Sequence, residues 1–290
     1  MVILQVSKVR YQYHDGTYAL SGVCLNIKRG EMLAILGQNG SGKTTLLKHL
    51  NGLLKPSKGE VYFKQKPLDS FPPREIFQRV GMVFQDPNDQ LFAPTVWEDV
   101  AFGPFNQGLT KNEIDHAVEE ALTQVDMIPY AKKTVDALSY GQKKRVCVAG
   151  VLAMKPEVLV LDEPACGLDP AGVTSLMKLL SGLNVQRGLT IIMATNTVDF
   201  VPVYMDRLAV MYQGKILTEG IPEEVFSNTG EIKQAHLELP QIAQLMQLLR
   251  DENNIPMDRL PLTVGEARKF LAHVLDSNCP ATKATDMKMI

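Results

Sequence analysis

Residues 37–45 read GQNGSGKTT, and their types and spacing suit the binding of a phosphate chain. Glycines at 37, 40 and 42 let the backbone approach closely, so that successive N–H groups can surround phosphate oxygens. Lys43 supplies positive charge to the β- and γ-phosphates, and the Thr44 hydroxyl suits magnesium. A turn that only joins a strand to a helix is the alternative. The predicted nucleotide-binding residues are Gly37, Gln38, Asn39, Gly40, Ser41, Gly42, Lys43, Thr44 and Thr45.

Two adjacent carboxylates, Asp162 and Glu163, follow the apolar run VLVL at residues 158–161. In an open α/β sheet the carboxyl ends of the strands face the ligand crevice. Asp162 can hold magnesium through its water shell, and Glu163 is then placed to order and deprotonate an attacking water. Solvated acids at an exposed strand end are the alternative. Together with Lys43, the pair indicates nucleotide hydrolysis rather than binding alone.

A second stretch, LSYGQKKR at residues 138–145, combines a helix start with an excess of positive charge. Ser139 and Gln142 have the spacing of a capping box, in which each side chain satisfies a backbone N–H of the first turn. Gly141 gives access to the backbone, and three cationic residues follow at once. Because free N–H groups at a helix start attract anions, the stretch predicts a second phosphate-binding feature.

Short apolar runs bounded by turn signals suit strands that are buried on both faces of a parallel sheet. Helices are expected between them, one after Thr110 with Glu113 completing a capping box, and one after the N-cap Asp169. Strands alternating with helices predict an α/β core. The runs are residues 32–36, 80–84, 158–161 and 190–194.

Helical signals without a buried strand fill residues 86–155, approximately, which predicts a helical insert within the α/β core. After a predicted hairpin at Gln213 and Gly214 the chain becomes helical again, with amphipathic segments at residues 240–254 and 263–275. We therefore expect a core domain over residues 1–225, an appended helical region over 226–280 and a loose tail over 281–290.

Composition excludes several classes. Hydrophobic residues make up 45% of the chain and charged residues 21%, as in an ordinary globular protein. The net charge of -2 gives no electrostatic reason to expect nucleic acid as a partner. The N-terminus lacks the apolar core of a signal peptide, and no apolar run is long enough to span a membrane. The four cysteines are scattered, which favours free thiols in a reducing compartment over a metal site.

Five motifs together resemble those of ABC-type ATPase subunits: GQNGSGKTT, Gln85 after VGMVF, LSYGQ, VLVLDEP and GLDP, in that order over residues 1–225. The resemblance implies a P-loop NTPase (RecA-like) core with an N-terminal β region, an inserted α-helical subdomain and ATP and Mg²⁺ as cofactors. It also implies a head-to-tail dimer, in which Ser139, Gly141 and Gln142 of one subunit cap the ATP of the other and Asp169 couples the two sites.

Other roles are carried over by the same resemblance. Gln85 is expected to contact magnesium and the water, and Tyr13 to stack on adenine, although each residue type alone is more often structural. Tyr140 stands where these proteins usually have glycine, and Asn196 where they have a catalytic histidine. Asparagine can donate a hydrogen bond to the γ-phosphate but cannot carry a proton, so turnover could be reduced.

The segment QDPNDQLFAPTVWEDVAFGPFNQGL at residues 85–109 resembles the insert of energy-coupling-factor importer ATPases. The resemblance implies a transmembrane coupling subunit, a substrate-binding membrane subunit and a second ATPase subunit as partners, at the cytoplasmic face of the cell membrane. Residues 201–226 look most like the cobalt or nickel branch. Two alternatives stay open: a catalytically weakened subunit of an asymmetric pair, and a soluble ABC ATPase that does not act in transport.

Overall fold

The computed structural model describes residues 1–278, which divide into two compact units, Met1–Glu238 and a second that begins at Leu239. Each unit is described by itself. The tail expected over residues 281–290 lies outside the described residues. None of the helices formed by residues 1–278 has the length and apolar character required to cross a membrane.

A six-stranded sheet in the first unit has the order β10-β9-β3-β8-β7-β6. Its neighbouring strands are parallel except for the β9–β10 hairpin, which turns at Gln213 and Gly214 as predicted. The unbroken apolar runs form strands buried along their whole length. The strands are β3 (Met32–Leu36), β6 (Val80–Val83), β7 (Val158–Asp162), β8 (Thr190–Thr195), β9 (Arg207–Tyr212) and β10 (Lys215–Gly220).

A smaller antiparallel sheet has the order β2-β1-β4-β5. One hydrophobic core contains side chains of both sheets and of α1 (Lys43–Leu50), which contributes Leu46, Leu47 and Leu50. The helix that begins at the phosphate-binding loop is thereby anchored on its buried face. The strands are β1 (Val2–Gln12), β2 (Tyr18–Lys28), β4 (Lys58–Phe63) and β5 (Lys66–Pro67).

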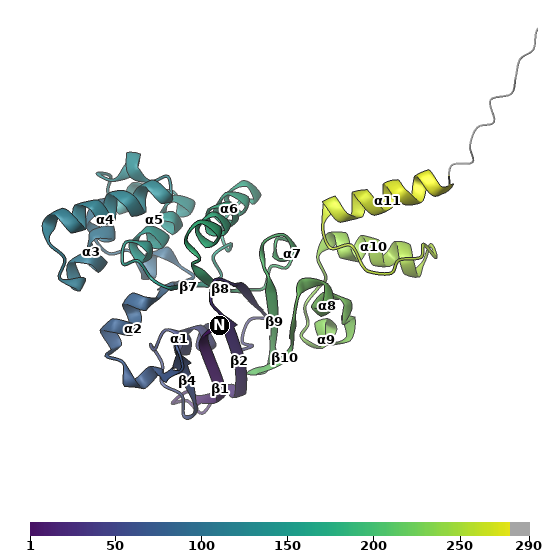
Figure 1. Cartoon of the computed structure of the whole chain (residues 1–290), viewed down its shortest axis with the longest axis horizontal. Helices are drawn as coiled ribbons and strands as arrows, with labels where there is room; N and C mark the ends of the chain where they lie inside the picture. Colours follow the sequence, from purple (N-terminus) through teal and green to yellow (C-terminus); the bar gives the residue numbers. More distant parts are fainter. Residues whose placement is uncertain (279–290) are drawn as a thin grey trace, which may run out of the picture. The chain divides into compact units, whose positions relative to one another are not determined.

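Between β6 and β7 the chain forms helices and no strand, and α3, α4 and α5 lie together (Figure 1). Capping boxes begin all three helices, at Thr95, Thr110 and Ser139. These helices are α3 (Val96–Gln107), α4 (Lys111–Gln124) and α5 (Tyr140–Leu152), with 3-10 turns at Pro87–Asp89, Ile128–Tyr130 and Val135–Ala137. The other helices of the unit are α2 (Pro73–Arg79), α6 (Pro170–Arg187), α7 (Val201–Tyr204), α8 (Pro222–Ser227) and α9 (Thr229–Gln234), with a 3-10 turn at Leu68–Ser70.

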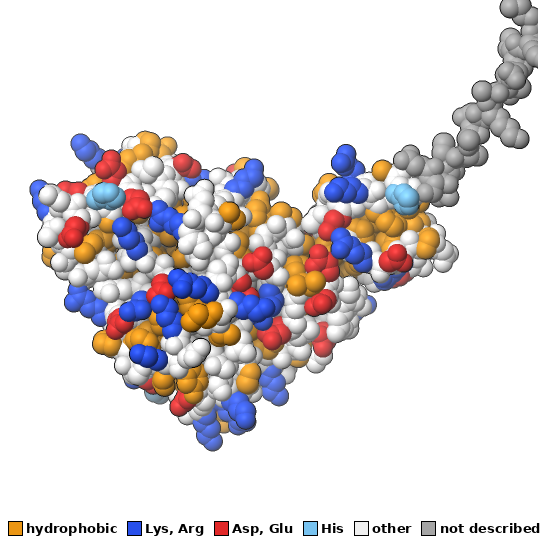
Figure 2. All heavy atoms as spheres, viewed as in Figure 1, with side chains coloured by type: hydrophobic (Ala, Val, Ile, Leu, Met, Phe, Trp, Pro, Cys, Tyr) orange, Lys and Arg blue, Asp and Glu red, His pale blue; other side chains and the backbone are white. Residues whose placement is uncertain are grey.

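The second unit contains α10 (Gln241–Asp251) and α11 (Val264–Asn278). The Thr263 hydroxyl accepts from the Glu266 N–H at 3.2 Å, and the Glu266 carboxylate accepts from the Leu262 N–H at 2.8 Å, which anchors the start of α11. Hydrophobic side chains gather over these helices in Figure 2. The large apolar side chains exposed on the two helices are Leu245, Leu248, Val264 and Leu275.

Candidate functional site

The loop of residues 37–42 joins the end of β3 to the start of α1, and two of its glycines are required by close packing. A Cβ on Gly37 would lie 2.6 Å from the Met211 carbonyl oxygen, and one on Gly42 would lie 2.5 Å from the Ala19 carbonyl oxygen. Gly42 also has a φ of +104°, which L side chains rarely adopt. The two sheets therefore hold the loop in a shape that only glycine permits.

Lys43 lies inside this loop, with 6% of its surface exposed. Its Nζ donates to the Gly37 carbonyl oxygen at 2.6 Å and to that of Gln38 at 3.2 Å. Glu163 Oε1 lies 3.3 Å from the same ammonium, in an ion pair without a hydrogen bond. The structure thus brings together the cation and the carboxylate that the sequence separates by more than a hundred residues.

Asp162, at the end of β7, has 3% of its surface exposed, and burial raises the pKa of its carboxyl group. The Thr44 hydroxyl and the Lys43 ammonium oppose that rise in pKa. Asp162 Oδ1 is buried and has no hydrogen-bond partner. A buried carboxylate oxygen beside a hydroxyl is an arrangement of hard oxygen ligands that fits Mg²⁺.

Glu163 follows directly and has a φ of +43°, an uncommon backbone conformation for a residue with a side chain. Its Oε2 accepts from the Asn196 main-chain N–H at 3.3 Å, and its own N–H donates to the Ala194 carbonyl oxygen at 2.9 Å. The end of β8 therefore orients the carboxylate. Oε1 is left without a hydrogen bond, able to accept one from a water molecule.

A hollow of about 360 Å³ lies over the loop and receives Tyr13, Gln85 and Glu163 from other parts of the chain. The Tyr13 hydroxyl is 2.9 Å from Thr45 Oγ1, and the Tyr13 ring packs edge-on against Tyr11 with centroids 5.0 Å apart. Sequence reasoning missed three further lining residues, Thr17, Tyr18 and Ala19, because they follow no motif. The predicted residues that line the hollow are Tyr13, Gln38, Asn39, Gly40, Gly42, Lys43, Thr44, Thr45, Gln85 and Glu163.

The second predicted phosphate-binding feature does not line this hollow. Ser139 caps α5 by accepting from the Gln142 N–H at 3.3 Å, while the Gln142 side chain accepts from the Ser139 N–H at 3.0 Å. Gly141 lies in the first turn of the same helix. Asp169 caps α6 by accepting from the Gly172 N–H at 2.7 Å. These residues begin two helices, and none of them lines the hollow over the loop of their own chain.

The three cations after Gln142 all have partners within the chain, contrary to a role as free phosphate ligands. Lys143 Nζ donates to Asn88 Oδ1 at 2.9 Å. Lys144 donates to two main-chain carbonyl oxygens, and Arg145 to Val125, Asp126 and Ser175. Positive charge in LSYGQKKR therefore serves the fold, and the N–H groups of Ser139 and Gln142 are already used in the capping box.

Asn196 lines a separate hollow of about 680 Å³. Gln38 and Asn39 line this hollow and also the one over the loop. The imidazole-bearing residue in it is His236, whose carbonyl oxygen accepts from Gln38 Nε2 at 3.1 Å. Sequence reasoning missed His236, because it is forty residues from Asn196 and belongs to no motif. The hydrogen bond from Asn196 to Glu163 is donated by the main-chain N–H of Asn196.

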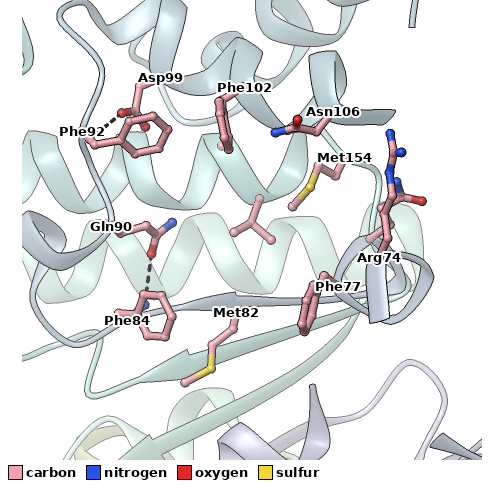
Figure 3. A pocket seen from close by; sticks show the side chains of 14 residues that line it. Arg74, Phe77, Met82, Phe84, Gln90, Phe92, Asp99, Phe102, Asn106 and Met154 are labelled. Carbon is pink, nitrogen blue, oxygen red and sulfur yellow. Dashed lines mark hydrogen bonds between the residues drawn. The ribbon is translucent and has the colours of Figure 1, made fainter. Parts of the chain in front are cut away.

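A third hollow, of about 540 Å³, is an apolar groove between α2 and β6 on one side and α3 and α5 on the other. Phe77, Met82 and Phe84 lie opposite Phe92 and Phe102 (Figure 3). Asp99 Oδ2 accepts from the N–H groups of Phe92 and Ala93 at 2.9 and 3.0 Å, which fixes the loop at the groove edge. Phe92 is 65% exposed and its ring packs edge-on against Phe102 with centroids 4.7 Å apart, whereas Val96 is buried.

Comparison with known proteins identifies the family to which the chain belongs. Residues 20–166 match the family model described as ABC transporter. The chain is 50% identical over 281 residues to the energy-coupling factor transporter ATP-binding protein EcfA of Methanocaldococcus jannaschii, covering 96% of this chain and 100% of that protein. CbiO1 of Clostridium perfringens, described as part of the ABC transporter complex CbiONQ, is 47% identical with a TM-score of 0.74, over 85% of this chain and 99% of its own.

A further solved structure, a dimeric ATP-binding cassette in a post-hydrolysis state with ADP and Pi, is 29% identical with a TM-score of 0.68, over 76% of this chain and 98% of its own. The expected P-loop NTPase core and the resemblance to importer ATPases are confirmed by these matches. Proteins of this family bind and hydrolyse ATP. The chain belongs to the ATP-binding subunits of energy-coupling factor transporters, within the ABC ATPases.

Proposed function

We propose that this subunit powers the import of cobalt or nickel ions, working as a head-to-tail pair of ATPase subunits at the cytoplasmic face of the membrane. The pairing rests on one observation: the loop that carries Lys43 lines the hollow of about 360 Å³, which we call the nucleotide hollow, whereas the helix start at Ser139 does not. A second subunit, identical or related, supplies the missing helix start. Ser139, Gly141 and Gln142 then face the nucleotide of the partner, and Asp169 couples the two sites.

At the nucleotide, each residue has a distinct task. The N–H groups of residues 37–45 and the Lys43 ammonium bind the phosphates, and Tyr13, which lines the hollow, offers a ring on which a base can stack. Thr44, Gln85 and Asp162 would hold Mg²⁺, which when bound neutralises charge on the β- and γ-phosphate oxygens. Glu163 accepts the proton of the attacking water at Oε1, while its Oε2 stays on the Asn196 N–H.

The membrane partners are assigned to the apolar groove. An exposed apolar surface such as that around Phe92 and Phe102 is expected where another protein binds. The groove lies between α2 and β6 on one side and α3 and α5 on the other. A helix of the transmembrane coupling subunit that lies in it would therefore be displaced when α3 moves relative to the sheet. A substrate-binding membrane subunit completes the importer.

The cargo is proposed from likeness alone, because CbiO1 belongs to a complex named CbiONQ. Among residues 1–278 no three His, Cys, Asp or Glu side chains are grouped so as to hold a metal ion. The transported ion is therefore assigned to the membrane subunits. ATP-dependent uptake of cobalt, nickel and an unrelated vitamin by the assembled transporter in vesicles distinguishes the cargo classes.

The test of hydrolysis is phosphate release from ATP and Mg²⁺ by the purified chain. Glu163→Gln is expected to lower kcat by about 10²- to 10⁴-fold, because it removes the general base. Glu119→Gln, an exposed carboxylate on α4, is the matched control and is expected to keep kcat. Equal turnover in wild type and Glu163→Gln would overturn the assigned role of Glu163.

A further inference from the structure

The second lysine of α5 is buried beneath the site rather than exposed on the helix. Lys144 has 4% of its surface exposed, although lysine is almost never fully buried without partners. Its Nζ donates to the Glu163 carbonyl oxygen at 3.1 Å and to the Pro164 carbonyl oxygen at 2.9 Å. Burial lowers the pKa of Lys144, so the surrounding structure bears a cost to keep an ammonium there.

Those two carbonyls belong to a strained part of the backbone. The φ of +43° at Glu163 is unfavourable for a residue with a side chain and persists only where surrounding contacts hold it. The Glu163 N–H donates to the Ala194 carbonyl oxygen. The Glu163 carbonyl oxygen accepts from Lys144 Nζ and from the Cys166 N–H. Lys144 therefore holds the Glu163 carbonyl from α5, and the direction of the Glu163 carboxylate depends on the backbone of that residue.

Tyr140, one turn earlier on the same helix face, covers the lysine. Lys144 Nζ lies 5.3 Å from the centre of the Tyr140 ring, within range of a cation–π interaction. The ring packs so closely on Gly167 that a Cβ there would lie 2.6 Å from Tyr140 Cε1. The Tyr140 hydroxyl donates to the Gln85 carbonyl oxygen at 3.5 Å. We name Tyr140 and Lys144 together the α5 clamp.

The α5 clamp connects the helix that begins at Ser139 to Gln85, Glu163 and Gly167 of its own chain. We infer that Lys144 is a positioning residue for Glu163, and that the α5 clamp makes hydrolysis at one site respond to what the Ser139 end of the same helix binds. The inference rests on the proposed function, in which Ser139 faces the ATP of the partner subunit. Tyr140, which replaces the glycine usual at that position, is thereby given a role.

Lys144→Met is the primary test, since it keeps the aliphatic stem and removes the ammonium. With full-length protein and ATP plus Mg²⁺, we expect kcat to fall by about 10-fold to 10²-fold while KM for ATP changes less than about threefold, because Lys144 does not contact the nucleotide hollow. Lys143→Met is the matched control, because the Lys143 ammonium donates to Asn88 rather than to the Glu163 carbonyl oxygen. It is expected to leave kcat and KM unchanged.

Rescue and coupling separate positioning from support of the fold. Lys144→Arg keeps a charged donor and is expected to regain part of the lost kcat. Ser139→Ala and Lys144→Met are expected to be non-additive in a double-mutant cycle, with Ser139→Ala costing less in the Lys144→Met background. Tyr140→Leu, which removes the ring over the ammonium, is expected to lower kcat several-fold and serves if Lys144→Met does not fold.

Several results would overturn the inference. Wild-type kcat in Lys144→Met, or additive effects in the cycle, would remove the positioning role while leaving the proposed function intact. If Lys144→Met is unfolded, wild-type kcat in Tyr140→Leu would do the same. Absence of turnover in the wild type, measured beside Glu163→Gln, would overturn the proposed function and the inference together.

Discussion

The loop before α1 and the start of α5 both suit phosphate, but one chain completes only the first. Around the loop, Gly37 and Gly42 pack on main-chain oxygens and Lys43 is buried beside Glu163. At the start of α5, the Ser139 cap is satisfied by Gln142 and the following cations bond within the chain. In the proposed head-to-tail pair, nucleotide affinity would therefore be a property of one subunit, whereas hydrolysis would require two.

Lys43→Ala gives the largest expected effect. It removes a buried cation from the phosphate-binding loop and leaves Glu163 without its ion-pair partner, so ATP affinity of the single chain should fall by about 10²-fold or more. Fluorescent-nucleotide titration at low protein concentration measures this. Lys178→Ala, an exposed lysine on α6, is the control and should bind ATP like the wild type. Unchanged affinity in Lys43→Ala would break the comparison at its first half.

Ser139→Ala should separate the two regions most sharply. Because Ser139 does not line the nucleotide hollow of its own chain, ATP affinity at low protein concentration should stay within about twofold of wild type. The kcat at high protein concentration should fall by about 10-fold to 10²-fold, as one donor to the partner's phosphate is lost. Loss of ATP affinity in the isolated chain would show that Ser139 serves its own site.

The sequence predicted those residues whose position depends on a local motif. Residues 37–45, Asp162 and Glu163 sit at strand ends, where a local motif and a buried strand determine position together, and the structure brings most of them into one hollow. The capping boxes at Thr110 and Ser139 are also local and are confirmed. What depends on a few neighbouring residues could be predicted from them.

Contacts between distant segments could not be predicted in this way. Three such contacts join segments that share no sequence pattern. Lys144 donates to main-chain carbonyl oxygens after β7, His236 lines the same hollow as Asn196, and Ala19 packs on Gly42. The sequence alone predicts phosphate binding from the excess charge of residues 143–145, because it does not show that Asn88, Pro164 and Asp126 lie nearby. In the structure, these three cationic side chains instead form hydrogen bonds within the chain.

Asp162→Asn should trade stability against chemistry. Burial raises the pKa of Asp162, so the charged form destabilises the fold; that penalty is absent below about pH 3.9, where the acid is protonated folded or unfolded, and grows as pH rises through the folded pKa. Without Mg²⁺ at pH 7 the variant should therefore have a higher Tm than the wild type. It should also lose Mg²⁺-dependent turnover.

The control for Asp162→Asn is pH. Scanning calorimetry near pH 3 should show equal Tm values for the variant and the wild type, if both remain folded there, and the difference should open as pH rises. Asp115→Asn on α4 should show no such trend. A lower Tm for Asp162→Asn at pH 7 without Mg²⁺ would contradict the assignment of Asp162 as an unsatisfied buried acid.

Asn196→His should have the smallest effect. The hydrogen bond from residue 196 to Glu163 comes from the main-chain N–H, which any residue other than proline supplies, so kcat should change by less than about threefold. Asn196→Ala, which also keeps that N–H, tests whether the amide side chain matters. A rise of 10² or more in Asn196→His would instead show that the wild-type chain is a weakened ATPase that needs an imidazole.

The most direct measurement mixes two variants of low expected activity, Lys43→Ala and Ser139→Ala, and follows phosphate release. In a head-to-tail pair, the mixed dimer has one intact site, with the loop of the Ser139→Ala chain facing the α5 start of the Lys43→Ala chain. We expect each variant alone to hydrolyse ATP more slowly than the wild type and the mixture to be more active than either variant. A mixture no more active than its components would contradict the claim that two subunits build each site.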